Sequence, residues 1–82
     1  MSHLPQDLHN LFPAATEQLR TLKETNRHFL ALADRYGAID DQLRHSEAGT
    51  GPAMDDMMAE DLKKERLAVL DQIAVMLEEE KA

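Results

Sequence analysis

Cysteine is absent from this 82-residue sequence. Without it the chain can form neither a disulfide nor a thiolate metal site. The four histidines are no substitute, because no two of them stand three or four residues apart, the spacing that places two ligands on one helix face. We therefore expect no metal and no cofactor. A chain this short must gain its stability from close packing or from association with another molecule.

Long apolar runs are also absent. No segment approaches the roughly 20 apolar residues that span a bilayer, and the N-terminus has neither the basic start nor the apolar core of a signal peptide. We expect no membrane association and a cytoplasmic location. Asp and Glu number 16 against 9 Lys and Arg, for a formal net charge of -7. An acidic surface repels phosphate, so the overall charge disfavours nucleic acid as a partner.

Glycine and proline are scarce, with three of each, and they mark the boundaries of the apolar pattern. The stretch Ala48-Gly49-Thr50-Gly51-Pro52 interrupts it, which predicts a turn over 48–52. Pro13 is a helix-start signal. The sequence therefore predicts one helix over about 13–47 and a second over about 53–80. The expected fold is all-α, an antiparallel two-helix hairpin with coiled-coil-like packing over residues 13–82.

Residues 1–12 form a separate short unit. Pro5 suits the first turn of a helix. The apolar side chains of this unit lie near one face at helical spacing, and they are Leu4, Leu8, Leu11 and Phe12. A helix this short is not stable alone in water. Two outcomes remain open, a short helical arm docked on the hairpin or a frayed tail.

The apolar positions of the two long segments predict the core of the hairpin. In the first helix they recur every seven residues with a second set three positions later, the a and d seam of a coiled coil. In the second helix they share one face at 100° per residue. Part of the first helix, before Leu22, should extend beyond the end of the second. The expected core comprises Leu22, Phe29, Leu32, Tyr36, Ile39, Leu43, Met58, Leu62, Val69 and Ile73.

The apolar face of the second helix is wider than one neighbouring helix covers, because Leu67, Leu70 and Ala74 extend it. This width predicts a homodimer or higher homo-oligomer, with two hairpins forming a four-helix arrangement. The residues expected to carry the self-association are Leu62, Leu70, Ile73 and Leu77.

Two charged residues fall on or beside these apolar faces. Asp40 sits next to the first seam, and Arg66 lies within the apolar arc of the second helix. A charge there requires a partner, since an unpaired one is costly to desolvate. We expect Arg66 to lie along Tyr36 and to pair with Asp40 or Glu47, a structural ion pair that helps to set the register.

The only basic cluster contains Lys63, Lys64 and Arg66, which could contact an anion. Acidic residues precede and interrupt it, so intrahelical pairs such as Glu60 with Lys64 are the simpler interpretation. Catalysis has little support, because no Ser-His-Asp order, phosphate-binding glycine loop or HExxH is present. We expect that the protein is not an enzyme.

Three segments stand in a recognisable order: Tyr36-Gly37-Ala38-Ile39-Asp40, Glu47-Ala48-Gly49 and Leu62-Lys63-Lys64-Glu65-Arg66-Leu67. With them the chain resembles the YdcH-like small proteins, a bacterial domain of unknown function, over roughly residues 8–77. Leu70 departs from the family, whose members often carry lysine there, and the change lengthens the apolar face. The resemblance implies a helical hairpin able to associate as a coiled coil, and it implies no activity.

The sequence thus favours a non-enzymatic interaction or adaptor module that acts through helix–helix contacts and self-association, with a protein partner that it does not identify. The alternative is a small regulator that binds RNA or another polyanion through Lys63, Lys64 and Arg66.

Overall fold

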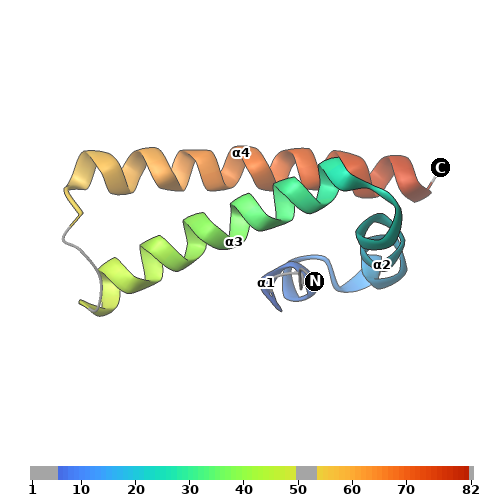
Figure 1. Ribbon diagram of the computed structural model, residues 1–82, viewed down its shortest axis with the longest axis horizontal. Coiled ribbons are helices and arrows are strands. Elements are labelled where there is room, and N and C mark those ends of the chain that lie inside the picture. The colour runs from blue at the N-terminus through green and yellow to red at the C-terminus, as the bar shows by residue number, and fades with distance from the viewer. Residues whose placement is uncertain (1–5, 50–53, 82) are drawn as a thin grey trace.

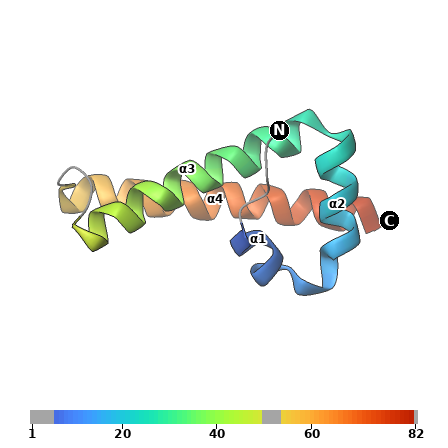
Figure 2. The same ribbon diagram turned by 60° about the horizontal axis from the view of Figure 1, so that its bottom comes forward.

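The computed structural model describes residues 6–49 and 54–81 (Figure 1). Its elements follow in the order α1 (Gln6–Leu11), the 3-10 helix η1 (Pro13–Ala15), α2 (Thr16–Thr25), α3 (Arg27–Ala48) and α4 (Asp56–Lys81). Every element of the described residues is helical, so the predicted all-α class is confirmed. Helices α3 and α4 pack side by side and run in opposite directions (Figures 1 and 2).

The first long helix is interrupted at Asn26, and the prediction of one continuous helix over 13–47 is wrong. Asn26 has an extended backbone with φ -129° and ψ 107°. Its side-chain Oδ1 accepts a hydrogen bond of 3.0 Å from the backbone N–H of Phe29, which caps the start of α3. Its own N–H donates to the carbonyl of Leu22 at 2.9 Å and closes α2. The residue therefore ends one helix and begins the next.

Because of this corner, α2 does not extend beyond the end of α4 as the sequence predicted. It turns across the end of the α3–α4 pair and packs against both helices (Figure 2). Leu19 and Leu22 are buried as a result. Burying a leucine side chain is worth about 1.5–3 kcal/mol, whereas one backbone hydrogen bond contributes a net of about 0.5–1.5 kcal/mol. Burial of two leucines therefore outweighs the interruption of the helix.

The corner supports a direct test of the cap. Replacing Asn26 by alanine should lower the free energy of unfolding by about 1 kcal/mol, the usual value of an N-cap side chain. Asn26→Asp should retain most of the stability, because its carboxylate also accepts from the Phe29 N–H. Urea denaturation followed by circular dichroism measures both. If alanine instead raised stability and helix content together, a continuous helix would be the preferred form.

The N-terminal arm is a docked helix. Leu8 of α1 is fully buried, which supports the first of the two alternatives for this unit. The corresponding expectations for Leu4 and Pro5 lie outside the described residues. Pro13 begins a 3-10 helix rather than an α-helix.

The predicted break between the two long helices coincides with the end of α3. Gly49 follows α3 in the left-handed conformation with φ 71°, and its N–H donates to the carbonyls of His45 and Ser46. Residues 50–53 of the expected turn lie outside the described part of the chain. On the far side, Asp55 Oδ1 accepts from the Met58 N–H at 2.7 Å and caps α4.

One cluster of buried side chains joins all the helices. It includes most of the expected core and also residues of α1, η1 and α2. The buried members are Leu8, Ala15, Leu19, Leu22, Phe29, Leu32, Ala33, Tyr36, Ile39, Leu43, Val69, Ile73 and Leu77. Leu62 is half-buried against this cluster.

Met58 was expected in the core, and this prediction is wrong. Its side chain is 54% exposed. The reason is geometric, because α3 and α4 diverge toward the end of the pair where α4 begins (Figure 1). No helix among the described residues has both the length and the apolar content to cross a membrane.

Candidate interaction groove

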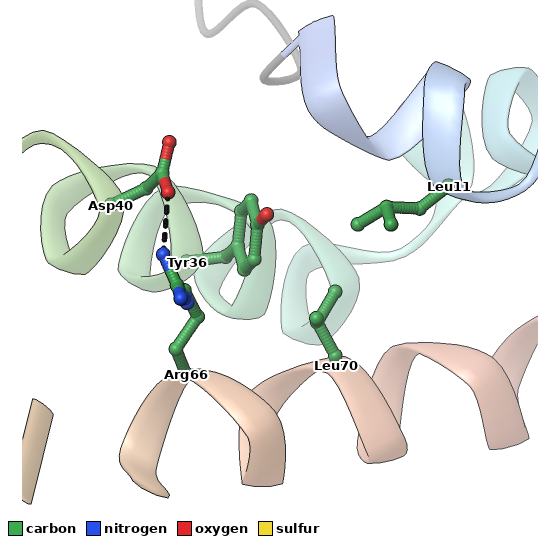
Figure 3. Close-up of a pocket in the computed structure, with 5 residues that line it drawn as sticks. All are labelled: Leu11, Tyr36, Asp40, Arg66 and Leu70. Carbon is green, nitrogen blue, oxygen red and sulfur yellow. Dashed lines mark hydrogen bonds and ion pairs between the residues drawn. The ribbon is translucent and has the colours of Figure 1, made fainter. Parts of the chain in front are cut away.

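An open groove of about 350 Å³ lies where α1 approaches the α3–α4 pair. Among the residues that the structure describes, one of α1, two of α3 and two of α4 line it, namely Leu11, Tyr36, Asp40, Arg66 and Leu70. Figure 3 shows an ion pair at one end, the Tyr36 ring beside it, and Leu11 and Leu70 at the other end. The groove is therefore charged at one end and apolar at the other.

The charged end is built on Asp40. Its Oδ1 accepts from Arg66 Nη1 at 2.9 Å across the two helices. Its Oδ2 lies 2.9 Å from Arg44 Nε, one turn later on α3. The side chains of Asp40 and Arg66 are 13% and 33% exposed. Arg66 thus pairs with one of its two expected partners, and the other, Glu47, is exposed to solvent.

A second ion pair joins the same two helices. Arg35 of α3 bonds Glu65 of α4, but here the side chains are 53% and 39% exposed. Both pairs link α3 to α4, but the Asp40–Arg66 pair is less exposed to water and Asp40 also pairs with Arg44. Comparing the two pairs therefore tests how far partial burial and a second charged partner together raise the value of an ion pair.

We expect a larger coupling energy for Asp40 with Arg66 than for Arg35 with Glu65. Alanine at Asp40 should cost about 1–3 kcal/mol, since it removes charged hydrogen bonds and leaves Arg66 partly desolvated. Exposed pairs couple by about 0.2–1 kcal/mol. Double-mutant cycles in urea measure both values. Purely additive losses for Asp40→Ala and Arg66→Ala would show that the pair does not fix the register.

The apolar end is formed by leucines that keep part of their side chains exposed to water. Leu11 is 50% exposed, and Leu70 is half-buried. Leu67 lies one turn before Leu70 on α4 and is 61% exposed. We call Leu11, Leu67 and Leu70 the apolar patch. Single exposed leucines are ordinary, but three beside one groove mark a surface suited to an apolar partner.

The self-association residues expected from the sequence do not form one free surface. Ile73 and Leu77 are buried within the cluster, so their assignment to a dimer interface is wrong. The prediction failed because α2 folds back onto the α3–α4 pair and joins the buried cluster that contains both residues. Leu62 and Leu70 are half-buried. The exposed apolar surface is therefore the apolar patch and not the predicted set of four residues. Leu67 was not in that set, although the sequence already showed that it widens the apolar face of α4.

The basic cluster does not converge on one point. Lys63 and Lys64 are exposed on adjacent positions of α4, which point 100° apart. The Arg66 guanidinium is bonded to Asp40, and the intervening Glu65 is bonded to Arg35. Over residues 6–49 and 54–81, no three His, Asp or Glu side chains gather as a metal site would require.

Comparison with known proteins finds one family. The model of the family described as Protein of unknown function (DUF465) matches residues 29–77, which span α3 from its first turn and most of α4. No curated protein and no solved structure matches the chain. The matched region supplies Tyr36, Asp40, Arg66 and Leu70 to the groove, and Leu11 comes from outside it.

Proposed function

The chain belongs to the DUF465 family, the YdcH-like small bacterial proteins of unknown function, and from that premise we propose that it is a non-enzymatic interaction module. It binds an amphipathic helix of another protein molecule. The observation that carries the proposal is the apolar patch beside the groove, which the chain's own helices leave partly uncovered.

The shape and chemistry of the groove support a helix as the occupant. A helix laid beside α4 presents apolar side chains at every third or fourth position, and one turn separates Leu67 from Leu70. Apolar side chains of the incoming helix would meet the patch. A polar side chain of the incoming helix would meet the charged end, where Asp40 is paired with Arg44 and Arg66.

A catalytic role has no comparable support. Among the described residues that line the groove, Asp40 alone carries a carboxylate, and both of its oxygens are engaged by arginines. The polyanion alternative also has less support, because Arg66 is turned toward Asp40 and the two remaining lysines diverge. A regulator of nucleic acid would need basic side chains that converge on one face.

Photo-cross-linking in the native cytosol tests the proposal. A photoreactive residue at Leu67 should form a defined adduct with another protein molecule. The matched control is Val75, which is 57% exposed on the same helix and lies outside the groove. At that position we expect no adduct of the same mass. Equal labelling from both positions, or from neither, would show that the patch is not the binding surface.

A further inference from the structure

The outer edge of α4 carries a stripe whose composition changes along the helix. The stripe begins with Lys63, continues through Leu67, Leu70 and Ala74, and ends at Glu78. These positions are spaced by three or four residues, so they lie along one side of the helix. Lys63, Leu67 and Glu78 are exposed, and the other two are half-buried. The stripe is therefore basic at one end, apolar in the middle and acidic at the other.

A stripe with this order is complementary to itself when reversed. We propose that the occupant of the patch is a second copy of this chain, with the two α4 helices packed antiparallel about a twofold axis near Leu70. This inference rests on the proposed function and names its partner. The arrangement places Lys63 opposite Glu78 of the second copy twice, and Leu67 opposite Ala74 twice. Leucine therefore meets a small residue, a combination that lets two helix surfaces interdigitate.

Charge selects this orientation over the parallel one. Parallel helices would set Lys63 beside Lys63 and Glu78 beside Glu78, and like charges in contact are destabilising. Two copies also repel one another electrostatically, since each carries a net charge of -7. Local pairing of the two stripe ends supplies the compensating attraction.

Leu11 contributes to the same surface from α1. It lines the groove together with Leu70, so a helix beside the stripe also covers Leu11. The contact is nevertheless small, because one helix edge and one α1 residue carry it. Interfaces below about 1,200 Å² are typically weak and transient. We expect a reversible dimer with a dissociation constant in roughly the micromolar range.

Charge reversal in the full-length chain tests the arrangement by sedimentation velocity over a concentration series. Lys63→Glu should weaken the dimer about tenfold, because the twofold axis repeats each lost ion pair and each new repulsion. Adding Glu78→Lys to that variant should restore the dissociation constant to within about threefold. Arg27→Glu, an equal change of charge at an exposed site on α3, should leave the dimer unchanged.

Two results of these experiments would overturn the inference. If the unaltered chain sediments as a monomer throughout the series, a second copy is not the occupant. If the double reversal fails to rescue dimerisation while circular dichroism shows the native helix content, the antiparallel register is wrong. A cross-link from Leu67 to a different protein would in either case leave the proposed function intact, so the two failures are distinguishable.

Discussion

Replacing Ile73 by alanine is expected to lower the free energy of unfolding by about 2–5 kcal/mol, as typical large-to-small core substitutions do. Ile73 is fully buried on α4 in the cluster that all the helices share. A domain of this length has a total stability of about 4–12 kcal/mol, so the loss removes a large share of it. Urea denaturation at low protein concentration provides the measurement.

Val75→Ala is the matched control, because it truncates another β-branched residue two positions away on the same helix. Val75 is mostly exposed, and alanine is the better helix former. Its stability should therefore change by less than about 0.5 kcal/mol. The loss at Ile73 should also be independent of protein concentration, since the residue is packed inside one chain. A loss that disappeared at high concentration would place Ile73 in a subunit interface instead.

The second large effect concerns α1. Leu8→Ala should cost about 2–5 kcal/mol, because Leu8 is fully buried although it lies on a helix of only six residues. Such a helix has no stability of its own. Its order therefore depends on tertiary packing, to which the buried Leu8 contributes, and hydrogen exchange should show α1 losing protection in the variant before the other helices do.

Leu11→Ala on the same helix provides the comparison. Leu11 is half exposed, so its truncation should cost well below 1 kcal/mol of stability. It should instead weaken binding at the apolar patch, which is measured by dimer dissociation or by the Leu67 cross-link. Equal losses of stability from Leu8→Ala and Leu11→Ala would show that α1 does not dock through the Leu8 face.

Ile73 lies inside the region that matches the family, and Leu8 lies before that region. Residues 29–77 match the DUF465 family, and α1 and α2 precede them. The N-terminal helices nevertheless complete the core, since Leu8 and Leu19 are buried in the same cluster as Ile73. They also shape the groove by supplying Leu11. The surface that the matched region presents in this protein is thus set partly by residues outside it.

Much of the helical architecture could be predicted from local sequence patterns. The period of the apolar residues predicted helices, and the glycine at position 49 marked the end of α3, because only a residue tolerant of positive φ fits there easily. The Asp40–Arg66 contact could be anticipated because a charge on an apolar face must find a partner. The sequence prediction missed the corner at Asn26, although asparagine is one of the residues most favoured at the N-cap of a helix.

By itself the sequence determined that the chain is helical, where its last long helix separates from the preceding one, and which faces are apolar, because these follow from local spacing and turn chemistry. Only the tertiary structure decided which of those apolar side chains are buried within one molecule. Ile73 and Leu77 are buried in the cluster that α2 joins after the chain turns at Asn26, whereas Leu11 and Leu67 stay largely exposed and Leu70 is half-buried. Which side chains are buried depends on which segments pack against each apolar face. The total free energy of burial decides this, and it cannot be read from the local spacing of residues.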